Sequence, residues 1–486
     1  MDGKYTTEKN QFTKGDYWNN THNSPHTDVD IDLDNVEDKE HDKRKKEQFC
    51  DYLHEFGSNT THHGVRYVTN PKNHVLRRLF WAVLLLAADS YLCYEVVHSF
   101  IRFYDYDVHT IVGVKYVPDL YFPAVTICNY NQMRKSKASP IVLSLNNALY
   151  SFEARLGKPI NWTIYEDILG SNSSFTDNFV DSIGYYAHQL NETVYDCKWR
   201  GVEPCDARNF TTTMTDWGVC WTFNDPKNKS EILKINQPGK QNGLLLTMDV
   251  QQYEYVSGET DAAGFKVLLH PQGVRPVLKE LGFSISPGFE TSVTVIYTKA
   301  VNLPRPYSNC RQEDLKPLKY SESYTVPLCQ QECKIDYVVR KCGCRDYRYP
   351  GDAPVCGPKQ LVECIYYNEV KFVEENIKCD CNESCSSANY GARTSIAYYP
   401  NEHFMSQITA TLNQSEEFIR NNYLDLRIFF EELSFNSVKQ IEAYPWTSLI
   451  SDIGGTMGLM VGMSLITVVE VFDFLLVWIW KRFCKS

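Results

Sequence analysis

Two long apolar segments constrain this chain more than any other feature of its sequence. The first runs from Leu79 to Phe103 and the second from Leu449 to Trp480. Each is long enough to cross the hydrocarbon core of a bilayer, which takes about 20 helical residues. We therefore expect two transmembrane helices, at residues 75–103 and 448–480. Two buried helices of a soluble core are the disfavoured alternative, because most globular helices are shorter.

Basic residues beside these segments predict the topology. Arg77 and Arg78 precede the first segment, and Lys481 and Arg482 follow the second. Positive charge gathers on the cytosolic side of membrane spans, and the polar N-terminal region carries no signal-peptide pattern. We therefore expect both termini in the cytosol. The resulting segments are a cytosolic N-terminus (1–74), an extracellular domain (104–447) and a cytosolic C-terminus (481–486).

The distribution of cysteines agrees with this topology. Of the 17 cysteines, 14 lie between Cys128 and Cys385, and the other three are Cys50, Cys93 and Cys484. An even number suits a fully disulfide-bonded extracellular framework. A zinc site at the two Cys-x-Cys pairs (342/344 and 379/381) is disfavoured, because these spacings are not those of zinc knuckles.

Sequons in the same region predict N-glycosylation, which modifies Asn-x-Ser/Thr triplets outside the cell. The candidate asparagines are Asn161, Asn172, Asn191, Asn209, Asn228, Asn382 and Asn413. Asn19 and Asn59 head similar triplets in the predicted cytosol, where they would stay unmodified.

The region between the spans has a mixed pattern, which predicts an α+β extracellular domain. Alternating apolar residues predict strands, and 3.6-residue periodicity predicts helices. The predicted strands are 121–128, 243–250, 264–270 and 291–297, and the predicted helices are 140–155 and 413–422. Residues 310–385 hold ten cysteines, so disulfides rather than a core must stabilise this part.

Charge and composition exclude other classes of function. The net charge is -11 and no basic patch stands out, so we expect no nucleic-acid partner. The acidic run from Asp28 to Asp34 lacks the glycine and glutamate of a calcium loop, and we predict no metal site. Residues 1–60 are polar and predict disorder.

Carboxylates within the second apolar segment indicate a cation pore. Asp452, Leu459, Ile466 and Asp473 follow a seven-residue spacing that places them on one stripe of a continuous helix, with Glu470 beside it. A carboxylate in hydrocarbon is costly and normally faces a bundle interior or water. Rings of such groups, one per subunit, attract cations. A lone carboxylate could instead snorkel at the interface, but three on one face favour a pore.

Glycines in the same segment indicate a narrow passage. Gly454, Gly458 and Gly462 form two overlapping GxxxG spacings, which let helix backbones approach closely. Helix packing without a pore would explain them equally well. Around a pore, however, they also free backbone carbonyls to coordinate an ion. Our candidate constriction is therefore Gly462-Met463-Ser464.

Several short motifs occur in a fixed order across residues 62–480. They are His63-Gly64, Phe122 to Asn129, Cys220 to Asn224, Leu281-Gly-Phe283 with Pro287-Gly-Phe289, Pro350 to Pro354, and Asp452-Ile-Gly-Gly455 leading into Gly462-x-Ser464. Together they resemble the degenerin / epithelial sodium channel / acid-sensing ion channel superfamily, and the chain is most similar to its FMRFamide-gated branch.

The resemblance implies a homotrimeric, sodium-selective plasma-membrane channel that amiloride-type compounds block. It implies a hand-like ectodomain with palm, thumb (about 310–390), finger, knuckle and β-ball, and no cofactor beyond the permeant Na⁺. The implied site residues are the gating motif His63 and Gly64, the filter Gly462, Met463 and Ser464, the gate region Gly455 and Leu459, the pore acids Asp452, Glu470 and Asp473, and a wrist pair, Tyr106 and Tyr307.

The resemblance also implies how the extracellular cysteines pair. The implied disulfides are Cys128–Cys220, Cys197–Cys205, Cys310–Cys385, Cys329–Cys381, Cys333–Cys379, Cys342–Cys364 and Cys344–Cys356. Five of these pairs would lie across the thumb like the rungs of a ladder.

The trigger for opening is predicted by what the chain lacks. Acid-sensing relatives use clustered carboxylates, whose pKa values rise toward the working pH. Here Glu369 is out of register, Arg427 and Ala262 replace acids, and Asp107-Val108 replaces a histidine pair. A proton trigger is therefore disfavoured, and the resemblance to the FMRFamide-gated branch implies opening by an extracellular FMRFamide-type neuropeptide.

Other functions stay open at this point. Within the channel class, the alternative is a proton-gated or constitutively open sodium channel. From another class, it is a non-conducting two-pass adhesion or receptor glycoprotein. An enzyme is not expected, because the sequence holds no nucleophile elbow, zincin motif or phosphate loop.

Overall fold

The computed structural model describes residues 53–150, 160–165, 183–226, 231–312 and 318–483. The chain forms two compact units. The helical unit contains the described residues up to Ile101 and those from Thr447 onward, and the sheet unit contains Arg102–Trp446. Predictions for residues 1–52, Asn172, Asn228, the end of the helix expected over 140–155, and residues 484–486 lie outside the described residues.

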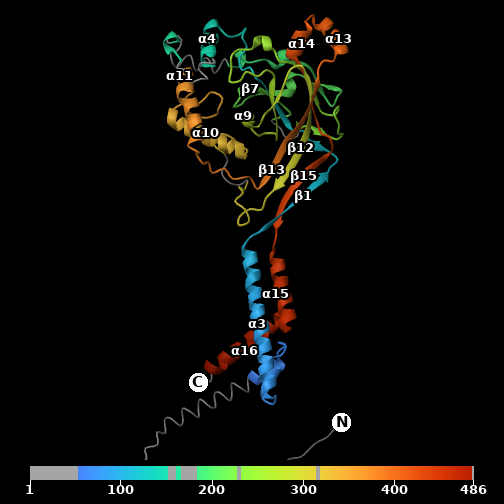
Figure 1. Ribbon diagram of the computed structural model, residues 1–486, viewed down its shortest axis with the longest axis vertical. Coiled ribbons are helices and arrows are strands. Elements are labelled where there is room, and N and C mark those ends of the chain that lie inside the picture. Colours follow the sequence, from blue (N-terminus) through green and yellow to red (C-terminus); the bar gives the residue numbers. More distant parts are fainter. Residues whose placement is uncertain (1–52, 151–159, 166–182, 227–230, 313–317, 484–486) are drawn as a thin grey trace, which may run out of the picture. The chain divides into compact units, whose positions relative to one another are not determined.

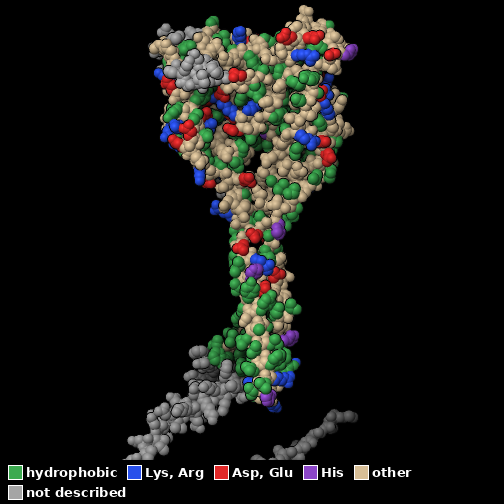
Figure 2. Space-filling model, in the orientation of Figure 1, with side chains coloured by type: hydrophobic (Ala, Val, Ile, Leu, Met, Phe, Trp, Pro, Cys, Tyr) green, Lys and Arg blue, Asp and Glu red, His purple; other side chains and the backbone are tan. Residues whose placement is uncertain are grey.

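The helical unit is built from long apolar helices. Its helices are α2 (Val65–Thr69), α3 (Val75–Tyr104), α15 (Trp446–Val461) and α16 (Leu465–Phe483). Among the described residues, α3 is the single helix that is long and apolar enough by itself to cross a membrane. Figure 2 shows hydrophobic side chains over much of the visible surface of α3 and α15. This exposure is typical of helices that meet lipid or other subunits.

The second apolar segment differs from the continuous helix predicted by its sequence. It is broken between α15 and α16, whose axes differ by 74°. Gly462 has a φ of +65°, a left-handed conformation that favours glycine and ends α15. Ser464 then caps α16 by accepting a hydrogen bond from the Thr467 N–H at 3.4 Å. The predicted stripe therefore stops at the break, with Asp452 and Leu459 on α15 and Ile466 and Asp473 on α16.

The sheet unit contains one large mixed sheet that runs the length of the unit (Figure 1). Its path is β1-β15-β12-β14-β9-β4-β5, and β13 pairs with β12. The strands are β1 (Val108–Tyr116), β4 (Val194–Trp199), β5 (Glu203–Pro204), β9 (Leu244–Asp249), β12 (Phe289–Val301), β13 (Ser386–Tyr398), β14 (Tyr423–Phe429) and β15 (Ser434–Glu442). β1 and β15 are antiparallel, from Val108 opposite Glu442 to Tyr116 opposite Ser434.

A second sheet has the order β11-β10-β3-β7-β6, and two short strands pair separately. These strands are β2 (Leu120–Tyr121), β3 (Ala124–Asn129), β6 (Phe210–Met214), β7 (Val219–Phe223), β8 (Lys234–Ile235), β10 (Phe265–His270) and β11 (Phe283–Ile285). The strand predicted at 121–128 is therefore two strands, interrupted at Phe122-Pro123 because proline cannot donate to the ladder. The other three predicted strands correspond to β9, β10 and β12.

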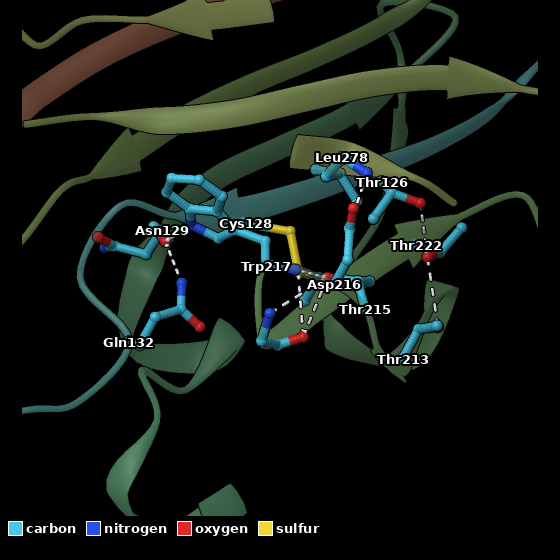
Figure 3. The surroundings of a disulfide bond; sticks show 12 residues. Thr126, Cys128, Asn129, Gln132, Thr213, Thr215, Asp216, Trp217, Thr222 and Leu278 are labelled. Atoms are coloured by element: carbon cyan, nitrogen blue, oxygen red, sulfur yellow. Dashed lines mark hydrogen bonds between the residues drawn. A yellow bond between two sulfur atoms is a disulfide. The ribbon is translucent and has the colours of Figure 1, made fainter. Parts of the chain in front are cut away.

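The main core contains apolar side chains from both sheets. Phe122, Phe223 and Phe430 are almost fully buried, and Phe122 contacts each of the other two edge to face. Burying each such side chain stabilises the fold by about 1.5–3 kcal/mol. Figure 3 shows the disulfide Cys128–Cys220, which joins β3 to β7 beside this core.

The sheet unit also contains helices between its strands. They are α4 (Pro140–Leu149), α8 (Leu190–Thr193), α9 (Leu278–Leu281), α10 (Val326–Cys342), α11 (Pro358–Gln360), η5 (Leu361–Tyr366), α12 (Tyr367–Glu374), α13 (Glu402–Leu412) and α14 (Glu416–Asn422), with short turns η1 (Trp162–Tyr165), η2 (Ala207–Asn209) and η4 (Gln252–Glu254). The helix predicted at 413–422 starts later, since Asn413 ends α13 with a φ of +51° and Ser415 caps α14.

Seven disulfides stabilise the sheet unit, and they join the same pairs that the resemblance implies. Five of them connect residues between Cys310 and Cys385. This region has only a small core around Tyr337, Val338 and Ile365. Cross-links that restrict the unfolded chain therefore contribute much of its stability.

Candidate functional site: a helix break and a buried cavity

The helix break brings two predicted motifs into contact. The backbone N–H of His63 donates a hydrogen bond to the carbonyl of Val461 at 3.0 Å. A β-carbon on Gly462 would overlap the imidazole of His63. The sequence predicted the His-Gly motif and the Gly-Met-Ser motif separately, and the structure places them side by side.

Residues 61–67, which we call the N-terminal loop, contain the His-Gly motif. Gly64 lets this loop pack closely against α3. It has a φ of +90°, and a β-carbon there would lie 3.1 Å from Trp81 and 3.2 Å from Leu85. The ring of Tyr67 stacks on Trp81 with centroids 4.7 Å apart. The loop is thus held on one side by α3 and on the other by the break.

The predicted pore acids do not come together within one copy of the chain. Asp452 lies on α15, whereas Glu470 and Asp473 lie on α16. Glu470 is close to the N-terminal loop, with its Oε2 3.4 Å from the Thr61 N–H, and Asp473 is exposed. In the predicted gate region, Leu459 is 81% exposed, and no described atom lies within 4 Å of a β-carbon built on Gly455. This face of α15 has room for another helix.

The wrist pair lies at the base of the large sheet. The rings of Tyr106 and Tyr307 meet edge to face with centroids 5.4 Å apart. Tyr106 has a φ of +52°, which turns the chain just before β1. The backbone carbonyl of the next residue, Asp107, accepts a hydrogen bond from the Ala443 N–H after β15 at 2.9 Å. The contact therefore joins the strand pair β1–β15 to the segment that enters the thumb.

A cavity of about 140 Å³ opens beside α4, and we name it the α4 cavity. Segments far apart in the sequence form it: α4, the turn after β3, the loop before β10, and the chain between α10 and η5. Most of its lining is apolar or aromatic, including Val142, Leu145, Leu149, Tyr150, Trp217, Val256, Tyr347 and Leu361. An apolar cavity with few polar groups is typical of a ligand site.

Charged residues at the wall of the α4 cavity neutralise one another. Arg348 is 4% exposed and donates hydrogen bonds to both carboxylate oxygens of Asp346 and to Glu259. Lys279 lies 3.0 Å from the other oxygen of Glu259. Although burial opposes ionisation, Arg348 and Lys279 bring the pKa of Glu259 down to about 2. This carboxylate therefore stays ionised in mild acid.

Glu369 and Arg427, which the sequence also singled out, both take part in ion pairs. Glu369 lies 3.3 Å from Lys334. Arg427 lies 2.7 Å from Asp425 and 3.2 Å from Glu290. Sequence reasoning missed Asp346 and Arg348; the only local signal is their i, i+2 spacing after Cys344.

Asp249 in the sheet unit has a raised pKa, in contrast to Glu259. Asp249 is 9% exposed, and it accepts hydrogen bonds from the Gln251 N–H at 2.8 Å and from the Tyr253 hydroxyl at 3.3 Å. Burial raises its pKa to about 6 in spite of these bonds. It can therefore change charge near neutral pH.

The candidate glycosylation sites that the structure describes lie on the surface. Asn161, Asn191, Asn209, Asn382 and Asn413 are all exposed. Within the described ranges, no three His, Cys, Asp or Glu side chains gather as a metal site requires.

A broken, glycine-containing apolar helix and a large disulfide-rich domain are features that a membrane ion channel can combine. A family model described as amiloride-sensitive sodium channel matches residues 56–474. The chain therefore belongs to the amiloride-sensitive sodium channel family.

Named relatives are similar along most of their length. Acid-sensing ion channel 1B of Danio rerio is 32% identical over 431 residues, which cover 87% of this chain and 76% of that protein. Acid-sensing ion channel 2 of Rattus norvegicus is 32% identical, covering 86% and 85%. Acid-sensing ion channel 1 of Gallus gallus is 32% identical, covering 88% and 84%.

Proposed function

We propose that this chain is one subunit of a homotrimeric, sodium-selective channel of the plasma membrane, opened by an extracellular FMRFamide-type neuropeptide. α3 and the bent pair α15–α16 span the membrane, both termini lie in the cytosol, and the sheet unit lies outside. The observation that supports the pore is the break at Gly462–Ser464, where the chain leaves helical geometry within an apolar segment. Irregular backbone at membrane depth is tolerated only where it is buried in protein or lines water.

Three copies of α15 then surround the pore. The open sides of Gly454, Gly455 and Gly458 leave room for close approach between these helices. Asp452 on α15 and Glu470 and Asp473 on α16 supply negative charge on either side of the break, which attracts cations. Residues 462–464 act as the filter, and amiloride-type compounds block the pore.

The α4 cavity is the proposed site of the neuropeptide. Its aromatic and aliphatic lining suits the phenylalanine and methionine side chains of an FMRFamide-type peptide. Glu259 at its wall is already paired with Arg348. Its pKa of about 2 keeps it ionised between pH 5 and pH 7, so protons in this range do not neutralise it. This neutralised cavity is the main support for a ligand over a proton.

A proton trigger is the second candidate, and one residue favours it. Asp249 has a pKa of about 6, within the range where extracellular acidification would protonate it. The similar proteins of zebrafish, rat and chicken are also named acid-sensing ion channels.

Voltage clamp of cells that express the full chain separates these functions. Peptides of FMRFamide type and steps from pH 7.4 to pH 5 are applied to wild type, Val142→Trp and Asp249→Asn. If the peptide opens the channel, Val142→Trp fills the cavity and weakens the response, whereas Asp249→Asn leaves it intact. Val202→Trp, at a site 80% exposed, is the matched control.

Each alternative has its own outcome in this experiment. Current on acidification that Asp249→Asn abolishes, with silence to every peptide, would establish the proton trigger instead. An amiloride-sensitive current without any stimulus indicates a constitutively open channel. Surface protein that passes no current under any condition indicates a non-conducting receptor or adhesion protein.

A further inference from the structure

An acidic residue lies within the first apolar helix, far from its ends. Asp89 comes 14 residues after Val75, the first residue of α3. At 1.5 Å per residue this places it about 21 Å along the helix. A carboxylate at such a depth in hydrocarbon is costly, and it normally has a partner.

The partner of Asp89 comes from the N-terminal loop. Nε2 of His62 lies 3.4 Å from Oδ1 of Asp89, and the histidine side chain is 13% exposed. An ionised carboxylate only accepts hydrogen bonds, so the tautomer of His62 with its proton on Nε2 can donate to Asp89. His62 directly precedes the His63-Gly64 motif, so the pair links that motif to the middle of α3.

The loop runs antiparallel to α3 and contacts it at successive turns. Tyr67 stacks on Trp81, and Gly64 packs against Trp81 and Leu85. His62 meets Asp89 one turn beyond Leu85. The contacts of Tyr67 and Gly64 are apolar, whereas the contact between His62 and Asp89 is polar and directional. The polar contact therefore fixes how far the loop reaches along α3.

The other side of the loop contacts the helix break. The His63 N–H donates to the Val461 carbonyl, and the hydroxyl of Thr61 contacts that of Thr467. Thr467 is fully buried and also accepts a hydrogen bond from the Ser464 N–H at 3.1 Å. A shift of the loop along α3 would therefore move the groups that hold residues 462–464.

We infer that the pair His62–Asp89 positions the His-Gly loop against the filter, and that Asp89 thereby determines ion selectivity from outside the helices α15 and α16. The inference rests on the proposed function, because it takes residues 462–464 as the filter. Asp89 and His62 are positioning residues: neither has a described contact with residues 462–464, and both act through the loop.

Permeability ratios test this role in cells that express the full chain. The ratio of Na⁺ to K⁺ permeability is measured from reversal potentials, with whichever peptide or pH step opens the wild type. We expect Asp89→Leu and His62→Leu each to lower the ratio roughly threefold to tenfold. The double variant should lower it no further, because each single variant already removes the same His62–Asp89 contact. Asp89→Glu should keep most of the wild-type permeability ratio, because it keeps the carboxylate.

A control and a second measurement separate positioning from folding. Glu95→Leu removes another carboxylate from α3, and it should leave the ratio unchanged. Cross-linking needs no open channel, and it is done in a background that replaces Cys50, Cys93 and Cys484 by serine. There, His62→Cys with Asp89→Cys should form a disulfide under mild oxidation, whereas His62→Cys with Glu95→Cys should not.

The outcomes distinguish this inference from the proposed function. If Gly462 and Ser464 variants change the ratio while Asp89 and His62 variants do not, the inference is wrong and the filter stands. Failure of the cysteine pair to cross-link also overturns it. If no variant of residues 462–464 alters the ratio, the proposed filter itself is wrong.

Discussion

The backbone N–H of His63 is hydrogen-bonded to the carbonyl of Val461, the last residue of α15, at 3.0 Å. This bond ties the N-terminal loop to the residue at which the second apolar segment leaves helical geometry. The following residue, Gly462, meets two demands at once. Its φ of +65° favours glycine, and His63 occupies the space where a side chain would lie.

Gly462→Ala should therefore distort the break. A left-handed conformation costs a non-glycine residue about 1–2 kcal/mol, and the methyl group also overlaps His63. We expect a lower ratio of Na⁺ to K⁺ permeability and less current per channel at the surface. His63→Ala combined with Gly462→Ala removes the overlap but not the strain, so it should recover part of the current. Gly113→Ala, which adds its methyl group in open space on β1, is the control.

Arg348→Gln should destabilise the sheet unit at neutral pH. The change leaves Asp346 and Glu259 without their shared guanidinium, and breaking such a buried pair costs about 3–5 kcal/mol. We expect a clear fall in the melting temperature of the purified protein at pH 7.4. Arg208→Gln breaks only an exposed pair with Asp206 and should change the melting temperature little.

The same variant makes a prediction about pH. The pKa of Glu259 is held at about 2, below its usual 4.5, so its ion pairs stabilise the fold above pH 4.5. That contribution is lost as the pH falls from 4.5 toward 2. The gap in melting temperature between wild type and Arg348→Gln should therefore narrow over this range. A gap that stays constant would mean that Glu259 is not held by Arg348.

Asp249→Asn should stabilise the protein at neutral pH. The pKa of Asp249 is raised from 3.8 to about 6 by burial, so the ionised form costs stability above pH 6 and protonation removes this cost. A shift of about two pKa units corresponds to about 3 kcal/mol as an upper estimate. We expect the wild type to gain melting temperature from pH 7.5 to pH 5, and Asp249→Asn to lose most of that dependence. A wild-type melting temperature that falls over this range would contradict the assignment.

Tyr307→Ala should weaken coupling at the wrist. Edge-to-face contacts between aromatic rings contribute about 0.5–1.5 kcal/mol, so we expect the concentration of stimulus for half-maximal current to rise about twofold to tenfold. Tyr307→Phe keeps the ring and loses only the hydroxyl that bonds Glu442, so it should shift this concentration less than Tyr307→Ala. Surface labelling checks that the amount of channel is unchanged, and Tyr367→Ala at an exposed position of α12 is the control.

Strands with a regular alternation of apolar residues could be predicted from the sequence. The alternation of Leu244, Leu246 and Met248 predicts β9, and the structure buries all three side chains. The break at Gly462 was missed as a change of helix direction, because the apolar pattern continues through it. The break has a left-handed glycine and packs against His63, about 400 residues away in the sequence.

Of the candidate functional site, only the parts marked by a sequence motif could be predicted. The His-Gly and Gly-Met-Ser motifs identify the two sides of the break. The α4 cavity has no such signature, because it is assembled from separated segments and its charges pair across the sequence, as between Arg348 and Glu259. Asp89 was visible only as an interruption of an apolar run, and its partner His62 becomes evident once the loop is folded back on α3.

The most direct test of the central claim is the reversal potential of the peptide-evoked current, with Na⁺ outside and K⁺ inside the cell, for wild type and Ser464→Ala. The account predicts an amiloride-blocked inward current in the wild type, with a reversal potential well above zero that Ser464→Ala moves toward zero. A current that reverses at zero in both proteins, or surface channels that pass no current with any peptide or pH step, would contradict it.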